Sequence, residues 1–365
     1  MDFESYVKNE MPDHSDMGYY SYRNIFNRKD LDNNYPSIYM ISTNRTAGKT
    51  TSALEISLDL YRRYGLQTCL LYRYGYELSA CGSIYTDVLS LYPQYGEEMT
   101  TKAMANGLFY QMLLDGEVFG YAVALNKPDQ LKKYSPLFTK CYLCIFDEYQ
   151  LETGQYLPDE FGKLQSIIFT IARGGGKQSR ELKILMLGNN VSLMNPYFIK
   201  YSIHKRLMND TKFLRGHGWI AEFGFNESAS KAIQENPLYK AFADADTTYT
   251  AYATQSVYLY DTKQFIESYS GRSIYLFTIK YDGKFYGVRD CSDGGFIYIS
   301  KKPDMTYPTI IAFNANDHDQ ITMLINRKDY LWKNIRDAFN KGYLRFDDAE
   351  TKNMIFEILG IDLYK

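Results

Sequence analysis

The stretch SIYMISTNRTAGKT, residues 37–50, contains the segment that decides the fold. Its first five residues, 37–41, are mostly apolar and partly β-branched, which is typical of a buried strand. A short polar loop follows and ends in the tripeptide GKT. Residues 51–64 then favour a helix, and Gly65 is placed to end it. Because residues 68–72 form a second strand candidate, the region predicts the βαβ unit of a parallel α/β sheet.

The loop at residues 43–50 occupies the position of a Walker A motif, G-x-x-x-x-G-K-[ST], although Thr43 replaces the first glycine. In that motif backbone N–H groups at a helix N-terminus cradle phosphate, a lysine reaches the β and γ oxygens, and a hydroxyl binds Mg²⁺. Lys49 and Thr50 fit the last two roles. We expect the nucleotide contacts to come from Asn44, Arg45, Thr46, Ala47, Gly48, Lys49, Thr50 and Thr51.

Polar side chains also follow two later strand candidates. Asp147 and Glu148 directly follow residues 142–146, which are the most strand-like run of the chain. An apolar run followed by Asp-Glu is the Walker B pattern of NTPases with a catalytic glutamate, so Asp147 would bind Mg²⁺ and Glu148 would polarise the attacking water. Asn189 ends the next buried run. It is placed to contact the γ-phosphate or the lytic water, and the alternative is a simple Gly-Asn turn.

Composition narrows the classes of protein. The 365 residues are 45% hydrophobic and 23% charged with a formal net charge of −2, which excludes disordered, collagen-like and coiled-coil chains. A nucleic-acid partner would need a local basic strip. No apolar run is long enough for a membrane span, and the acidic N-terminus favours a cytoplasmic location. Cys141 and Cys144 lie three apart on a strand, where side chains point to opposite faces, so we interpret both as core residues.

The chain divides where this strand–helix rhythm is lost. Residues 1–225 predict a three-layer α/β ATPase domain, and residues 226–260, rich in Ala and Ser, predict a helical linker. Residues 261–365 combine strands and late helices in a smaller α+β domain. Turn signals at 282–283 and 293–295 are typical of hairpins.

The order of these parts resembles the DNA-packaging (encapsidation) ATPases of small podophages, relatives of large terminase subunits in the additional-strand P-loop class. The phosphate loop of that family usually has the pattern G-x-R-G-x-G-K-T. This chain has the arginine and the GKT but carries Thr43 and Thr46 in place of two glycines. The second strand candidate of this chain ends in YRYGYEL, residues 72–78. This is similar to the family, in which the second strand often ends in an arginine followed by an aromatic residue and Glu-Leu. The resemblance covers residues 20–225, and the C-terminal third only by position.

The resemblance implies an ATPase that uses ATP and Mg²⁺ to drive double-stranded viral DNA into a procapsid in the cytoplasm of an infected bacterium. Its subunits would form a homo-oligomeric ring, a pentamer in the family. The implied partners are double-stranded DNA and the portal, with or without a structural RNA, and no membrane. Residues 261–365 would be RNase H-like. Because the strand candidate 273–279 carries no carboxylate, we expect a vestigial nuclease used for docking.

A ring ATPase also needs an arginine finger from a neighbouring subunit, because one lysine and Mg²⁺ under-compensate the charge that grows on the γ-phosphate. Arg173, at the end of a predicted helix, is the preferred candidate, and Arg180 and the cis-acting Arg45 stay open. Contacts to DNA should be with phosphates, since packaging must ignore sequence. The candidates are Lys102, Lys127, Lys132 and Lys133.

Two other functions stay open from the sequence. One is another ring-forming DNA translocase or helicase of the P-loop class. The other is a regulatory switch whose altered phosphate loop binds NTP with little turnover.

Overall fold

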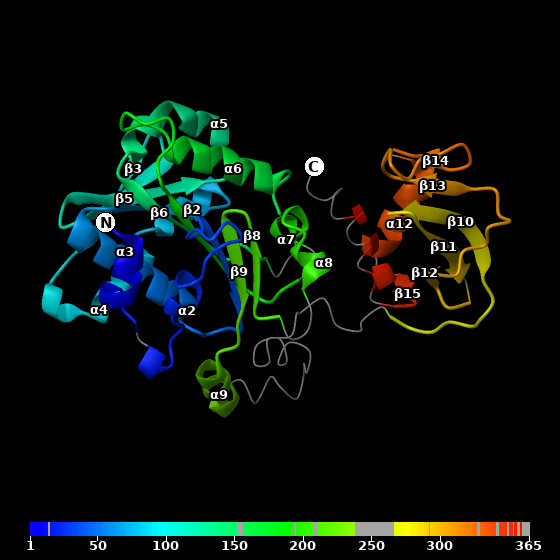
Figure 1. Cartoon of the computed structure of the whole chain (residues 1–365), viewed down its shortest axis with the longest axis horizontal. Coiled ribbons are helices and arrows are strands. Elements are labelled where there is room, and N and C mark those ends of the chain that lie inside the picture. Colours follow the sequence, from blue (N-terminus) through cyan, green and yellow to red (C-terminus); the bar gives the residue numbers. More distant parts are fainter. Residues whose placement is uncertain are drawn as a thin grey trace. The chain divides into compact units, whose positions relative to one another are not determined.

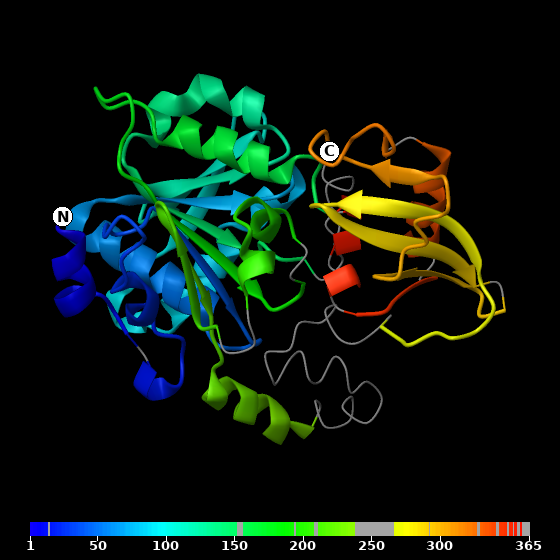
Figure 2. The same cartoon turned by 45° about the vertical axis from the view of Figure 1, so that its right-hand side comes forward.

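A computed structural model describes residues 1–13, 15–151, 156–192, 195–207, 211–237, 266–291, 293–326, 329–340, 343–348, 350–352, 354–355 and 358–359. The chain falls into two compact units, Met1–Tyr260 and Asp261–Lys365. Both units are drawn in Figure 1 and, turned by 45°, in Figure 2.

The first unit is built on a nine-stranded sheet in the order β3-β4-β5-β2-β6-β7-β1-β9-β8. The five pairings from β5 across to β9 are parallel, and β3, β4 and β8 are antiparallel additions at the two sides. β7 therefore lies between β1 and β6, the strands that end at the two nucleotide motifs. The strands are β1 (Ile38–Thr43), β2 (Gln67–Tyr72), β3 (Met99–Met104), β4 (Phe109–Leu114), β5 (Glu117–Ala124), β6 (Cys141–Asp147), β7 (Lys183–Asn189), β8 (Phe213–Gly216) and β9 (Trp219–Phe223).

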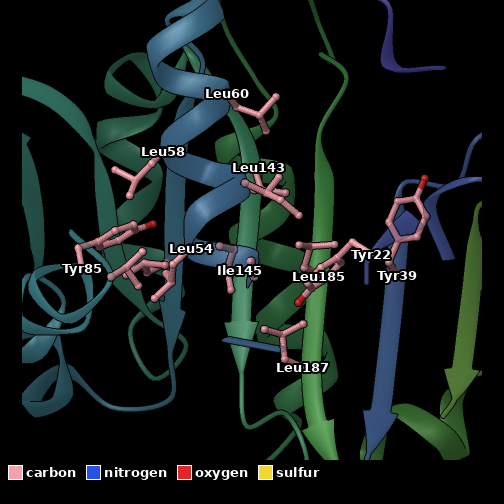
Figure 3. Packing of buried hydrophobic residues seen from close by; sticks show 14 of the residues in the cluster. Tyr22, Tyr39, Leu54, Leu58, Leu60, Tyr85, Leu143, Ile145, Leu185 and Leu187 are labelled. Carbon is pink, nitrogen blue, oxygen red and sulfur yellow. The ribbon is translucent and has the colours of Figure 1, made fainter. Parts of the chain in front are cut away.

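Helices cover both faces of this sheet and make three layers (Figure 1). On one face α3 (Lys49–Tyr64) packs against β2, β6 and β7. Figure 3 shows Leu60 on the side of Leu143, whereas Leu54 and Leu58 lie on the side of Tyr85. That face also carries α1 (Phe3–Ser5), η1 (Tyr6–Glu10), α2 (Arg23–Phe26) and α4 (Ser83–Ser90). The opposite face carries α5 (Pro128–Leu131), η5 (Lys132–Phe138), α6 (Glu160–Ile171), α7 (Pro196–Lys200) and α8 (Ile203–Arg206). Shorter elements are η2 (Ser15–Met17), η3 (Gly75–Ala80) and η4 (Pro93–Tyr95), and α9 (Glu227–Glu235) follows β9.

The parallel core agrees with the α/β sheet predicted from the sequence. The antiparallel strands at its two sides were not predicted. β3, β4 and β5 fall in a region whose mixed composition hid them. The turn between β4 and β5 is Asp115-Gly116, with φ values of +50° and +84°. Asp-Gly between alternating apolar residues is a strong hairpin signal that was available in the sequence.

The expected opposite orientation of Cys141 and Cys144 is wrong. The register between β2 and β6 shifts beside Cys141, where Gln67 pairs with Cys141 but Thr68 pairs with Leu143. This β-bulge adds one residue and interrupts the alternation of faces. Cys141 and Cys144 consequently lie in the same buried cluster as Cys69. Burial raises the pKa of the Cys69 and Cys141 thiols well above the usual range, which makes them poor nucleophiles.

The second unit contains a six-stranded sheet in the order β14-β13-β10-β11-β12-β15. β10 to β12 form an antiparallel meander, and β13, β14 and β15 are added in parallel. The expected turn at Asp282-Gly283 joins β10 to β11, with φ values of +49° and +73°. The elements are β10 (Ile274–Tyr281), β11 (Lys284–Cys291), β12 (Phe296–Ser300), β13 (Ile310–Ala312), β14 (Met323–Leu324), α12 (Tyr330–Asn340) and β15 (Leu344–Phe346).

Two expected helical regions are only partly seen. α9 lies in the expected linker, whose residues 238–260 are outside the described part of the chain. In the expected closing helix at 347–359, the described residues 350–352, 354–355 and 358–359 are helical. None of the helices in the described ranges combines the length and apolar composition of a membrane span.

Candidate active site

The phosphate loop joins β1 to α3 through two residues with left-handed backbone. Gly48 has a φ of +75°, and a Cβ there would lie 2.4 Å from the ring of Tyr19, so only glycine fits. Thr46 has a φ of +63°. A β-branched residue in this conformation costs about 1–2 kcal/mol, which glycine would avoid. The loop thus adopts a strained turn although it lacks two of the glycines usual in this motif.

The carboxyl ends of β1, β6 and β7 bring the predicted side chains together. Lys49 Nζ lies 2.8 Å from Thr43 Oγ1 and 3.2 Å from Asn189 Oδ1. Thr50 Oγ1 donates to Asp147 Oδ2 at 2.7 Å. Neighbouring parallel strands end at the same edge of a sheet, which is why residues 140 positions apart meet here. Lys49, Thr50, Asp147 and Asn189 therefore form one cluster.

Burial sets the charge balance of this cluster. It lowers the pKa of Lys49 to about 8, with the Asp147 carboxylate opposing the shift and Arg45 adding to it. Burial also raises the pKa of Asp147, against the hydrogen bonds from Thr50 and the Glu148 N–H and the charge of Lys49. Each buried charge thus favours an added partner of opposite sign, as a phosphate or a cation would supply.

Glu148 is exposed, and its backbone is held in a left-handed conformation with a φ of +54°. Such a backbone costs about 1–3 kcal/mol unless its surroundings fix it. Arg73 fixes it, since Nη1 donates to the Glu148 carbonyl and Nη2 to the Tyr149 carbonyl, both at 2.7 Å. The Tyr149 N–H also donates to the Leu187 carbonyl at 3.1 Å. The loop carrying Glu148 is therefore anchored to β2 and β7.

A buried ion pair holds Arg73 itself. Its guanidinium lies 3.1 Å from the carboxylate of Glu160, which is 0% exposed. That carboxylate also accepts from the Tyr197 hydroxyl at 2.6 Å and from the Leu157 N–H at 2.9 Å. The sequence placed Arg73 at the end of a strand and in a pattern similar to that of the family, without indicating its partners. Its contacts to residues 75 to 87 positions away leave no local signal.

Replacing Arg73 by leucine should destabilise the first unit by about 3–5 kcal/mol, because the buried Glu160 carboxylate loses its counter-charge. The measurement is the urea midpoint of the full chain. The matched control is Arg63→Leu, which removes a 2.8 Å ion pair to Asp59 whose arginine is 47% exposed and should cost at most about 1 kcal/mol. Equal shifts in the two variants would contradict the role of the buried pair.

The segment before β1 packs against the phosphate loop. The Tyr20 N–H donates to the Ala47 carbonyl at 2.7 Å, and the Tyr22 hydroxyl donates to the Lys49 carbonyl at 2.8 Å. Both tyrosines are buried, and the Tyr20 hydroxyl is hydrogen-bonded to Glu222 on β9. Residues before β1 therefore brace the loop from outside the motif.

Asn44 does not turn its side chain toward the loop. Its Nδ2 donates to the Asn226 carbonyl at 3.0 Å, and its Oδ1 accepts from the Asn226 N–H at 2.8 Å. Asn226 also accepts from the Ala229 N–H and so caps α9. The side chain of Asn44 is thus used to tie the phosphate loop to the start of α9.

The arginine candidates lie in different surroundings. α6 leads from the end of β6 back toward the start of β7, so Arg173 lies at the edge of the sheet opposite the phosphate loop, and it is exposed. Arg180 is anchored at the same edge, because its guanidinium donates to the carbonyls of Cys141, at 3.0 Å, and Phe138, at 2.9 Å. Arg45 lies beside Lys49, whose pKa it lowers.

The four lysine candidates for DNA contact are spread over the first unit. Lys102 lies on the exposed edge strand β3, and Lys127 follows β5. Lys132 is paired with Asp129 at 2.6 Å, and Lys133 is exposed beside it.

A parallel sheet whose strand, phosphate loop and helix present Lys49 and Thr50 to Asp147 is the fold and site of a P-loop NTPase. Residues 21–362 match the family model for the podovirus DNA encapsidation protein (Gp16), and the chain belongs to this family.

Individual relatives agree with this membership. The DNA packaging protein of Bacillus phage phi29 is 24% identical over 318 residues, which cover 86% of this chain and 90% of the relative. The fold is similar to that in the solved bacteriophage Phi-29 viral genome packaging motor assembly, with a TM-score of 0.54, 22% identity and coverage of 95% of this chain and 99% of that chain. For the Phi-28 gp11 DNA packaging motor the TM-score is 0.57 at 16% identity, covering 95% and 97%.

Proposed function

We propose that this protein is a Mg²⁺-dependent ATPase of the additional-strand P-loop class that drives double-stranded viral DNA into a procapsid. The observation that carries the proposal is the cluster of Lys49, Thr50, Asp147 and Asn189 in a chain of the encapsidation family. The position of β7 between β1 and β6 supports the additional-strand class. The relatives that are named DNA packaging proteins support DNA as the molecule that is moved.

The residues of the cluster fit ATP and Mg²⁺. Thr50 Oγ1 and Asp147 Oδ2, 2.7 Å apart, are the hard oxygen ligands that Mg²⁺ prefers. Lys49 Nζ is hydrogen-bonded to uncharged oxygens of Thr43, Asn44 and Asn189, which a phosphate oxygen can replace. When bound, Mg²⁺ would neutralise charge on the β and γ oxygens.

The chain's own residues then supply the rest of the chemistry. Glu148, exposed at the edge of the sheet, orients the attacking water and accepts its proton. Arg73 fixes the backbone from which that carboxylate projects. Asn189, which contacts Lys49 directly, is placed to respond when the γ-phosphate is lost.

The affinity for ATP should fall as the pH rises above 8. Since burial lowers the pKa of Lys49 to about 8, the amine is charged below this pH and neutral above it in the free protein. Phosphate binding requires the ammonium form, so Kd should be flat below pH 8 and rise about tenfold per pH unit above it. Equilibrium titration of a fluorescent ATP analogue measures this. Lys49→Arg, charged throughout, is the control, and a profile parallel to it would contradict the assignment.

Arg173 is the proposed trans finger. Its place at the opposite edge of the sheet separates it from its own phosphate loop, and its exposure leaves it accessible to a second copy. The carbonyl contacts of Arg180 make that residue a structural anchor. Arg45 remains the candidate that acts in cis.

For the second unit we propose an RNase H-like fold that docks to partners and does not cut DNA. A central antiparallel meander with parallel strands on both sides supports this fold. An aspartate is a usual metal ligand in such nucleases. The carboxylate of Asp317, however, accepts hydrogen bonds from the N–H groups of Asp282 and Gly283. The proposed partners of the whole chain are further copies in a ring, pentameric as in the family, double-stranded DNA and the portal of a procapsid, with or without a structural RNA. The proposed location is the cytoplasm of the infected host.

Turnover with and without double-stranded DNA tests the proposed function. ATP hydrolysis by the full chain should be Mg²⁺-dependent and should rise several-fold when blunt duplex DNA is added. ATP binding without turnover would instead indicate a regulatory switch. Equal stimulation by single-stranded DNA would favour a helicase.

A further inference from the structure

The loops after β2 and β5 lie side by side at the edge of the sheet that carries the nucleotide site. β2 and β5 are parallel neighbours, and the pairing continues past them, because the Asn126 N–H donates to the Arg73 carbonyl at 3.1 Å. The residues that follow each strand, Tyr74 and Lys127, therefore leave the sheet at the same place.

Two stacked tyrosines lie there, called the tyrosine ledge (Tyr74 and Tyr76), with Tyr74 half-buried against the core and Tyr76 exposed. Their rings are stacked with centroids 5.3 Å apart and planes 12° from parallel. Tyr76 is 78% exposed, the largest exposed fraction among the large hydrophobic side chains of the described residues. The Tyr74 N–H donates to Glu77 Oε2 at 2.8 Å, which fixes the start of the ledge. Stacking restricts both rings before any partner arrives, which lowers the entropy cost of binding.

Lys127 adds a positive charge beside the ledge. Its Nζ lies 4.0 Å from the position that a Cβ on Gly75 would take, between the two tyrosines in sequence. Lys127 is exposed, whereas Lys132 is paired with Asp129. The ammonium group of Lys127 and the phenol hydroxyls of the ledge, of which that of Tyr76 belongs to an exposed side chain, are donors that suit phosphate oxygens.

The ledge is also joined directly to the catalytic loop. Arg73, the residue before Tyr74, donates to the carbonyls of Glu148 and Tyr149. A force on the ledge therefore reaches the backbone of Glu148 through a single buried side chain.

We propose that Tyr74, Tyr76 and Lys127 contact the phosphate backbone of double-stranded DNA, and that Arg73 links this contact to the position of Glu148. The inference rests on the proposed packaging function and deepens it by naming the DNA contact. Hydroxyl and ammonium groups read no base sequence, which suits a motor that must move along any DNA.

The experiment measures binding of a fluorescent blunt duplex to the full chain over a range of salt concentrations, with Mg²⁺ and a non-hydrolysable ATP analogue. Lys127→Gln should lower the slope of log K against log salt by about 0.9, because one phosphate contact is lost. Tyr76→Ser should weaken binding about tenfold at fixed salt. Tyr76→Phe keeps the ring and loses the hydroxyl, and it should show most of that loss.

Two variants of matched exposure are the controls. Lys140→Gln changes an exposed lysine next to the start of β6, at the opposite edge of the sheet, and Tyr330→Ser changes a tyrosine of the second unit that is 73% exposed. Both should bind DNA as the parent does. If Lys127→Gln and Tyr76→Ser match these controls, the ledge is not the DNA contact.

Two further outcomes separate this inference from the function on which it rests. If the parent protein does not bind duplex DNA and its ATPase rate does not rise with DNA, the proposed packaging function itself is contradicted. If the parent binds DNA and Tyr76→Ser instead weakens self-assembly, measured by light scattering without DNA, the ledge faces a neighbouring subunit and the inference is overturned.

Discussion

Glu148→Gln is expected to lower ATP hydrolysis by roughly 10²–10⁴-fold while ATP still binds. The amide cannot accept a proton from the attacking water, whereas Lys49, Thr50 and Asp147 keep their contacts with one another. Glutamine preserves the size of the side chain, so the backbone contact from Arg73 to residue 148 is retained. Single-turnover hydrolysis and equilibrium binding of ATP, measured on the same preparation, separate the two effects.

The control for this change is Glu98→Gln. Glu98 is exposed and lies just before β3, on the antiparallel side of the sheet. Its replacement should leave hydrolysis within about twofold of the parent. A Glu148→Gln protein that hydrolyses ATP at the parent rate would show that the active-site assignment is wrong.

Mixing two inactive variants is expected to restore part of the activity. Arg173→Ala should bind ATP yet hydrolyse it about 10³–10⁵-fold more slowly, because the neighbour's transition state loses a positive charge. Lys49→Ala should be inactive because its own phosphate loop is damaged. In a mixed ring the Arg173→Ala subunit keeps an intact phosphate loop, and a Lys49→Ala neighbour offers it an intact finger. Some sites are then complete, and the measurement is the ATPase rate against mixing ratio.

The control for this experiment is the pair Lys49→Ala and Glu148→Gln. Both changes damage the subunit that binds the nucleotide and leave Arg173 intact. Every site in such a mixed ring therefore carries a defect in its own subunit, which an intact finger from the neighbour does not repair. No rescue is expected from that mixture. Absence of rescue with Arg173→Ala, in rings shown to be mixed by native mass spectrometry, would move the assignment to Arg45, because Arg180 is bound to backbone carbonyls.

Local patterns were sufficient for the centre of the first unit. A buried strand, a GKT loop and a helix closed by Gly65 were readable in order, and the helix does end at a left-handed Gly65 with a φ of +64°. The positions of Asp147 and Asn189 at strand ends then placed them beside Lys49, because parallel strands share a carboxyl edge. Nothing beyond strand order was needed for that prediction.

Local patterns were insufficient where a contact joins segments with no common periodicity. Tyr20 reaches Glu222 across 202 positions, and Arg73 reaches Glu160 across 87. An arginine at a strand end can point into solvent, contact a ligand or pair with a buried carboxylate. The neighbouring residues in the sequence do not distinguish these three cases. Arg180 is an example, because only the fold turned it toward the carbonyls at the start of β6.

The sequence by itself thus determined the βαβ centre and the places of the Walker A and Walker B patterns, since strand and helix periodicity and turn chemistry are properties of neighbouring residues. Only the tertiary structure decided how the motifs are held. The left-handed backbone of Glu148 depends on Arg73, and the brace on the phosphate loop depends on Tyr20 and Tyr22. The bulge that turns Cys141 to the face of Cys144 depends on the pairing of β6 with β2. Each of these is settled by a distant partner, and a distant partner leaves no trace in the local pattern.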